Sequence, residues 1–149
     1  MKFDIIKKIY EKIPMKIKYL FLPIFVRVIA DNPTFKATCN ELKLFDTMSE
    51  LEKEQIQFQK LKEMLVYAGK YVPYYRNVFA QNNFDPEKMC SFEELKKIPI
   101  LTKKEIFGAG ERFYSEEEVP YYTAYTGGSS GKALKCLLDK DSYYKERAF

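Results

Sequence analysis

A glycine- and serine-rich stretch near the C-terminal end of the chain holds the residue types most suited to binding an anion. It reads TGGSSGK and lies between two runs rich in Tyr, Leu and Thr. Glycines free the backbone to adopt positive φ and to approach a ligand closely, and successive N–H groups in such a loop can converge on an anion. Hydroxyl and ammonium donors complete a set that matches phosphate oxygens. The predicted phosphate-binding residues are Thr126, Gly127, Gly128, Ser129, Ser130, Gly131 and Lys132.

Two common phosphate-binding patterns do not fit this stretch. A Walker P-loop needs a Gly five positions before its Gly-Lys pair and a Ser or Thr after it, but the chain has Thr126 and Ala133 at these places. The spacing also differs from GxGxxG. A flexible linker is the plain interpretation of a Gly/Ser tract, yet strand-like runs on both sides favour a hairpin loop. An NTPase with an atypical P-loop stays as an alternative, and it predicts a helix directly after Lys132.

The segment from Thr126 to Leu134 resembles the phosphate loop of the adenylate-forming (acyl-activating) superfamily. Two further blocks, VPYYR at 72–76 and FEELKKIPILTKKEI at 92–106, occur in the order found in the phenylacetate–CoA ligase family, which includes the CapK-type proteins of capsular polysaccharide gene clusters. The resemblance covers residues 61–149, and the part before it matches only loosely.

The chain departs from this family in two places. Ala133 stands where the family usually has Pro, and Leu134 stands where a Lys often follows. Whether Lys132 or Lys135 contacts phosphate therefore stays open. We assign no catalytic role to Lys103 or to its neighbour in the second block.

The resemblance implies a function in ATP-dependent activation of a small-molecule carboxylate. Mg²⁺ and ATP are the implied cofactors, and CoA or another acceptor would take the acyl group from the acyl-adenylate. The resemblance also implies that the acyl and adenine pockets, the magnesium carboxylate and the catalytic lysine lie beyond Phe149. We therefore predict no catalytic residue and no metal ligand here, and residues 1–149 alone are not expected to form an acyl-adenylate. The CapK-type likeness points to capsular polysaccharide biosynthesis.

The expected fold class is α/β, as the truncated N-terminal domain of an adenylate-forming enzyme. The chain itself is predicted to be mainly helical, with a β-hairpin near 121–138. Residues 1–48 are expected to form a basic amphipathic helical segment, and residues 49–149 the incomplete start of the domain. The final residues read as a helix without a stop signal, so we expect an N-terminal piece of a larger protein.

Composition narrows the classes of function. The 149 residues are 46% hydrophobic and 31% charged, which is typical of a globular protein. The net charge of +4 is concentrated in residues 1–30, which carry +5, so the rest carries −1 and offers no basic field for nucleic acid. With no His, the chain cannot form a His-based triad. Cys39, Cys90 and Cys136 lack metal-ligand spacing and indicate reduced thiols in the cytoplasm.

Residues 2–30 alternate lysines with apolar residues, at a spacing that predicts an amphipathic helix interrupted or kinked at Pro14 and Pro23. We favour packing of this helix against the body of the enzyme. The alternative is peripheral contact with the inner membrane surface through residues 2–30, and a non-catalytic membrane-surface or scaffold module is the corresponding function.

The positioning elements follow from local signals. Capping boxes at Ser49, Ser91 and Thr102 predict three helix starts, the first for a helix over about 50–71 with a buried stripe of Phe58, Leu61, Leu65, Ala68 and Val72. Pro73 predicts a second helix start, and Asp139 or Asp141 predicts the cap of a last helix. Asn32-Pro33-Thr34 predicts a turn, residues 36–46 are ambiguous, and 108–120 are expected to form an exposed linker. Tyr74, Tyr75 and Arg76 suit packing better than ligand binding.

Overall fold

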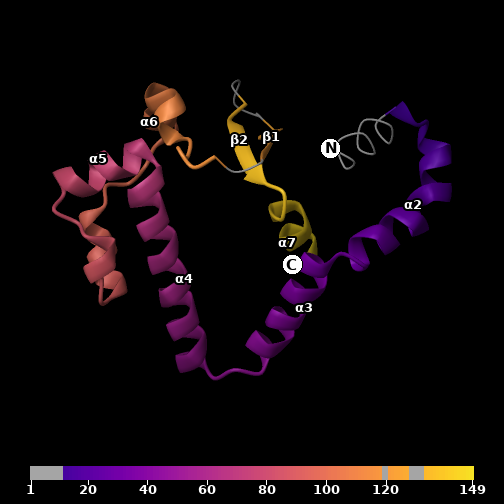
Figure 1. Cartoon of the computed structure of the whole chain (residues 1–149), viewed down its shortest axis with the longest axis horizontal. Coiled ribbons are helices and arrows are strands. Elements are labelled where there is room, and N and C mark those ends of the chain that lie inside the picture. The colour runs from indigo at the N-terminus through magenta and orange to yellow at the C-terminus, as the bar shows by residue number, and fades with distance from the viewer. Residues whose placement is uncertain (1–11, 119–120, 128–132) are drawn as a thin grey trace. The chain divides into compact units, whose positions relative to one another are not determined.

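The computed structural model describes residues 12–118, 121–127 and 133–149. The chain is mainly helical with one two-stranded antiparallel sheet, which confirms the mainly helical prediction with a hairpin near the C-terminus (Figure 1). It forms two units, Met1–Asp46 with Lys140–Phe149, and Thr47–Asp139. The elements are α2 (Met15–Ala30), α3 (Pro33–Asp46), α4 (Glu50–Tyr71), α5 (Pro73–Gln81), η1 (Pro86–Lys88), η2 (Phe92–Lys97), α6 (Lys103–Ala109), η3 (Gly110–Phe113), β1 (Tyr121–Tyr125), β2 (Lys135–Asp139) and α7 (Ser142–Ala148).

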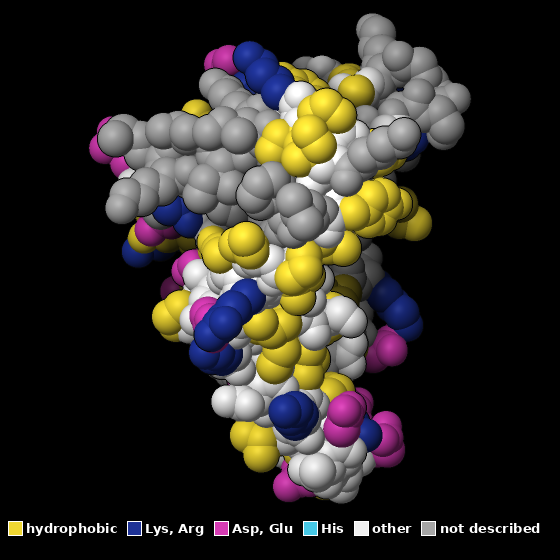
Figure 2. Space-filling model, turned by 90° about the vertical axis from the view of Figure 1, so that its right-hand side faces the viewer, with side chains coloured by type: hydrophobic (Ala, Val, Ile, Leu, Met, Phe, Trp, Pro, Cys, Tyr) yellow, Lys and Arg dark blue, Asp and Glu magenta, His cyan; other side chains and the backbone are white. Residues whose placement is uncertain are grey.

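Helix α2 begins directly after Pro14 and continues through Pro23, so the predicted interruption occurs at the first proline only. Large apolar side chains along it are exposed. Figure 2 shows one face of the molecule, on which hydrophobic side chains are exposed together with Lys, Arg, Asp and Glu side chains. Among the described residues, no helix combines the length and the apolar content that crossing a bilayer requires.

Helix α3 covers the residues that the sequence left ambiguous. The side-chain oxygen of Asn32 accepts hydrogen bonds from the N–H groups of Thr34 and Phe35, at 2.9 and 3.3 Å. Pro33 occupies the first helical position, where its missing N–H is not needed. The Asn-Pro pair that predicted a turn is therefore a helix start, because Asn is a strong N-cap residue.

Helix α7 packs on α3 within the first unit. Asp141 stands at its N-cap position, as one of the two predicted sites, but its carboxylate makes no cap hydrogen bond. One carboxylate oxygen instead accepts a hydrogen bond from the Thr34 hydroxyl of α3, at 3.1 Å. Asp141 thus joins the two helices. Its backbone carbonyl accepts hydrogen bonds from the N–H groups of Tyr144 and Lys145 in α7, both at 2.9 Å.

Two of the three predicted capping boxes are confirmed. The Ser49 hydroxyl accepts from the Glu52 N–H at 3.4 Å, and the Glu52 carboxylate accepts from the Ser49 N–H at 2.8 Å. Thr102 and Glu105 repeat this arrangement at the start of α6. The hydrogen bonds from the side chain and backbone of Ser49 hold the pKa of the Glu52 carboxyl below its usual value.

The third predicted capping box, at Ser91, is wrong in its central contact. Ser91 precedes the 3₁₀ helix η2 and its hydroxyl makes no cap hydrogen bond. The Glu94 carboxylate instead accepts from the Cys90 N–H at 2.8 Å and pairs with Lys97 at 3.1 Å, and these contacts lower the pKa of Glu94. A 3₁₀ turn has a tighter spacing than the α-helix for which the box is built.

The second unit is organised around the corner between α4 and α5 (Figure 1). Val72 ends α4 in extended conformation, and Pro73 starts α5 as predicted. The buried cluster at this corner consists of Leu65, Val78, Phe79, Phe84 and Met89. In the predicted stripe of α4, Leu65 and the residue that ends the helix, Val72, are buried, while Phe58, Leu61 and Ala68 are half-buried.

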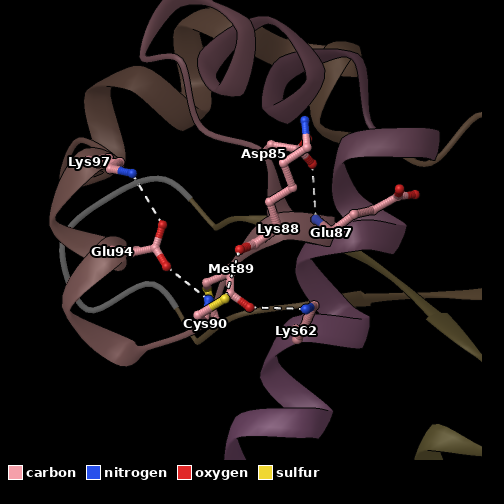
Figure 3. A network of polar contacts seen from close by, with 8 residues as sticks. All are labelled: Lys62, Asp85, Glu87, Lys88, Met89, Cys90, Glu94 and Lys97. Carbon is pink, nitrogen blue, oxygen red and sulfur yellow. Dashed lines mark hydrogen bonds and ion pairs between the residues drawn. The ribbon is translucent and has the colours of Figure 1, made fainter.

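Polar contacts surround the fully buried Met89, and one of them joins residues 85–97 to α4 (Figure 3). The Lys62 ammonium of α4 donates to the Met89 carbonyl at 2.9 Å. Asp85 caps η1 by accepting from the Glu87 N–H at 3.1 Å and pairs with Lys88 at 2.9 Å. The contacts of Lys62 and Asp85 satisfy the Met89 carbonyl and the Glu87 N–H, which the short 3₁₀ turn leaves unpaired. Met89 can therefore be buried without an unpaired carbonyl.

Replacing the hydroxyl residues of the two confirmed capping boxes should destabilise the chain, whereas replacing Ser91 should leave its stability unchanged. We expect Ser49→Ala and Thr102→Ala each to lower the free energy of unfolding by about 1 kcal/mol. Ser91→Ala is the matched control, with a change within about 0.5 kcal/mol because its hydroxyl caps nothing. Urea denaturation followed by circular dichroism measures all three, and equal losses would contradict the assignment.

The glycines of α4 and α6 should respond oppositely to alanine. A Cβ at Gly69 would lie 3.1 Å from Cδ2 of the buried Phe79, whereas no described atom lies within 4 Å of one at Gly108. We expect Gly108→Ala to stabilise the chain by about 0.5–1 kcal/mol through helix propensity. Gly69→Ala should give no gain and a loss of up to about 1 kcal/mol, because Phe79 is confined. Urea denaturation of both variants measures these changes in the free energy of unfolding. Equal stabilisation by the two substitutions would contradict the prediction, because it would show that the Phe79 side chain moves aside at no cost.

Candidate functional site

The predicted phosphate loop lies at the tip of the hairpin formed by β1 and β2. The strands are antiparallel, with Tyr121 opposite Asp139 and Tyr125 opposite Lys135. The strand–loop–strand arrangement predicted by the flanking sequences is therefore confirmed. A strand occupies residues 135–139, where a P-loop would have the beginning of a helix, so the structural expectation of the NTPase alternative is wrong.

Thr126 and Leu134 close the loop one step beyond the last strand pair. The Thr126 N–H donates to the Leu134 carbonyl at 3.0 Å, and the Leu134 N–H donates to the Thr126 hydroxyl oxygen at 2.9 Å. Because the hydroxyl oxygen accepts, its own proton stays directed away from this bond and can be donated to a ligand. Thr126 thus fixes both ends of a loop whose intervening positions are 127–133.

The structure covers only part of the predicted phosphate-binding set. Thr126 and Gly127 are described, and both are exposed. No described atom lies within 4 Å of a Cβ built on Gly127. Gly128, Ser129, Ser130, Gly131 and Lys132 lie outside the described residues.

A cavity of about 590 Å³ lies beside β2 within the second unit. Its wall is largely aromatic and aliphatic, and it includes Ala133 and Leu134 from the end of the loop. The lining residues that decide its character are Tyr67, Val72, Tyr75, Ile106, Phe107, Phe113, Tyr114, Tyr121, Leu134 and Leu137, with Lys135, Glu117 and Asp139 as the charged members. Such a surface suits a largely apolar group that carries a few polar or charged substituents.

The polar contacts of this cavity involve tyrosines. The Lys135 ammonium lies 5.3 Å from the centroid of the Tyr114 ring, which is a cation–π contact. The Tyr67 hydroxyl and the Ser115 hydroxyl are hydrogen-bonded at 2.8 Å. That bond lowers the pKa of Tyr67, but burial and the nearby Glu117 carboxylate outweigh it, and the pKa is raised overall. The Tyr67 hydroxyl therefore stays protonated at neutral pH.

The segment before the hairpin is not the exposed linker that the sequence predicted. Phe113 stacks on Tyr74 of α5 with ring centroids 4.0 Å apart, and the Glu116 N–H donates to the Tyr71 carbonyl at 2.7 Å. The Glu116 carboxylate pairs with Arg76 at 2.7 Å. The acidic run predicted exposure to solvent, but its first residue, Glu116, pairs with Arg76 and bonds the Tyr71 carbonyl. Phe113 is the residue in the sequence that could have indicated packing of this segment.

The VPYYR block therefore has a packing role at this corner. Tyr74 and Tyr75 contact each other and Phe113 edge-on or stacked, and burial raises the pKa of the Tyr75 hydroxyl. The Arg76 guanidinium also donates to the Lys70 carbonyl at 2.6 Å, so it bonds a carbonyl near the end of α4. The packing interpretation of these residues holds, although Tyr75 also lines the cavity.

Within the described ranges, no group of three or more Cys, Asp or Glu side chains is arranged to hold a metal ion. Cys39, Cys90 and Cys136 are free thiols. Comparison of the chain with protein-family models and with curated proteins gives no match. Its assignment to a class of function consequently depends on the geometry of the hairpin and its surroundings.

The side chain of Thr126 should determine how tightly the loop is closed. Thr126→Val keeps the shape and removes the acceptor of the Leu134 N–H. We expect amide exchange of Leu134 to accelerate roughly fivefold, which corresponds to a bond of about 1 kcal/mol. Hydrogen exchange followed by NMR measures this rate. Thr126→Ser should restore protection, and Thr123→Val, a matched change in β1, should leave it unchanged; acceleration by both valines would refute a specific closure.

Proposed function

We propose that the chain is the N-terminal part of an ATP-dependent carboxylate-activating ligase, and that residues 126–132 bind the phosphates of ATP. The observation that carries this proposal is the strand–loop–strand hairpin closed by the Thr126–Leu134 pair. A glycine-rich loop joining two extended segments matches the arrangement that the resemblance to the phenylacetate–CoA ligase family implies. It differs from the strand-to-helix turn of P-loop NTPases.

The chemistry of the loop suits a polyphosphate. ATP, when bound, would supply the α-phosphorus that the carboxylate attacks, so that the adenylyl group is transferred and pyrophosphate leaves. The Thr126 hydroxyl retains a proton to donate, and Gly127 leaves room for a close approach. N–H and hydroxyl donors that are already aimed at phosphate oxygens stabilise charge as it develops there. The sequence adds Ser129, Ser130 and Lys132 to this set.

The surroundings of the loop fit this class of reaction. The free thiols are consistent with a reducing compartment, so we place the protein in the cytoplasm, where ATP is available. The described residues offer no cluster for a metal, so Mg²⁺ would come bound to the nucleotide and would need carboxylates from elsewhere. The substrate class is a small-molecule carboxylate, with CoA or another acceptor, and a role in capsule synthesis depends on the family resemblance alone.

Titration of the 149-residue chain with pyrophosphate and ATP tests the proposal. We expect backbone amide resonances of residues 126–134 to shift, with a dissociation constant on the order of 1 mM because the loop alone provides contacts. Adenosine should not shift them, since the proposed site contacts phosphates only. NMR spectra of the labelled chain report each amide separately.

Matched lysines provide the control for this titration. Lys132→Ala should weaken pyrophosphate binding several-fold through loss of a charge-assisted contact. Lys104→Ala removes an exposed lysine from α6 of the same unit and should not change binding. Unshifted amides at saturating pyrophosphate, or equal effects of both substitutions, would overturn the phosphate-site assignment.

A further inference from the structure

Helix α2 exposes large apolar side chains on two opposite sides. At ~100° per residue, Met15, Tyr19, Leu22 and Val26 fall within an arc of about 60°, and they are 71%, 71%, 43% and 54% exposed. Ile17, Ile24 and Val28 fall on the other side and are also exposed. The first group forms a continuous apolar face, and such a face needs an apolar environment to cover it.

The charges around these side chains have one sign. From Lys12 to Ala30 the sequence contains four basic residues, Lys12, Lys16, Lys18 and Arg27, and no Asp or Glu. Arg27 is strongly exposed and pairs at 3.7 Å with Asp31, the first acidic residue after α2, which stands at the C-cap of the helix.

We propose that α2 is a peripheral anchor that lies on an anionic membrane surface, with apolar side chains entering the headgroup region. Such helices combine exposed bulky apolar residues with Lys and Arg that contact anionic headgroups. A helix that packs on a protein surface of mixed charge is expected to carry both acidic and basic residues, whereas α2 carries basic residues only. Charge complementarity therefore favours the bilayer over another segment of protein. The inference is independent of the proposed phosphate site.

The dimensions of α2 fit a position on the membrane rather than across it. Its 16 residues are about 24 Å long, which is shorter than the ~30 Å hydrocarbon core of a bilayer. Arg27 and Lys18 have flexible apolar stems that allow their charged ends to reach headgroups while the stems stay in apolar surroundings. Tyr19, with an apolar ring and a hydroxyl, suits the interface itself.

Vesicle co-sedimentation of the full chain tests this assignment. The two vesicle types are pure phosphatidylcholine and phosphatidylcholine with about 30% phosphatidylglycerol. We expect at least tenfold stronger partitioning to the anionic vesicles at roughly 0.05 M NaCl, and a strong reduction at roughly 0.5 M NaCl. Equal partitioning to both vesicle types would overturn the proposal.

Substitutions on exposed positions identify the helix responsible. Leu22→Glu with Val26→Glu should lower partitioning to anionic vesicles at least tenfold. The matched control, Leu51→Glu with Met64→Glu, changes apolar residues of α4 that are even more exposed, at 66% and 59%, and should leave partitioning unchanged. Arg27→Glu should weaken partitioning several-fold, and Lys104→Glu should not.

Sedimentation velocity distinguishes the other occupants of α2. Membrane binding by α2 is supported if the chain stays monomeric without lipid and if Leu22→Glu with Val26→Glu leaves its circular dichroism unchanged. A dimer that these substitutions dissociate would assign the surface to a second copy of the chain and overturn the proposal. Loss of helix content on substitution, with no lipid binding by the unaltered chain, would assign it to protein packing.

Discussion

The second unit depends on the close approach of Phe79 to the backbone of α4. Gly69 makes this approach possible, because any side chain there would begin 3.1 Å from the Phe79 ring. Glycine inside a helix is unfavourable by up to about 1 kcal/mol relative to alanine, so its presence in α4 requires a packing reason. With Phe79 seated, Phe84 and Met89 complete a buried cluster that holds α5 and the following 3₁₀ turns against α4.

The position of the candidate site follows from the same corner. Pro73 starts α5 directly after the end of α4. Shortly after it, Tyr74 stacks on Phe113 and Arg76 pairs with Glu116, so both contact the segment 110–117. That segment leads into β1, so its contacts connect the base of the hairpin to the corner, among them an aromatic stack, an ion pair and a backbone hydrogen bond. The ion pair between Arg76 and Glu116 is exposed, and exposed pairs contribute little to stability on their own. The stacked rings and the backbone bond to Tyr71 therefore carry most of this attachment.

Local signals in the sequence predicted most helix starts and the hairpin, whereas tertiary contacts decided the rest. Ser49-Glu52, Thr102-Glu105 and Pro73 act within one turn of helix, so their outcome could be predicted from neighbours alone. The start of α3 was missed because Asn-Pro is ambiguous between a turn and an N-cap. The packing of residues 110–117 was missed because it depends on Tyr74 and Arg76, which lie about 40 residues earlier.

The candidate site was predictable to a different depth. The strand pattern around the Gly/Ser tract predicted a hairpin, but it gave no indication that Thr126 would close the loop by accepting from Leu134. That contact depends on the register of the two strands, and side-chain alternation alone does not determine the register at a hairpin tip. The cavity beside β2 was also unpredictable, because it requires the hairpin and the corner in one unit.

The hairpin and any ligand of its loop must be energetically coupled. A two-stranded ribbon is only marginally stable by itself, and β1 and β2 form a sheet of these two strands in the described chain. A ligand that binds only the closed loop would stabilise the paired strands by mass action, and in return any contact that favours pairing would raise the affinity for that ligand. The Thr126–Leu134 pair is such a contact, since it closes the loop without using the hydroxyl proton. For a ligand bound by the loop, the Thr126 side chain would therefore act twice, once by ordering the strands and once by donating its remaining proton.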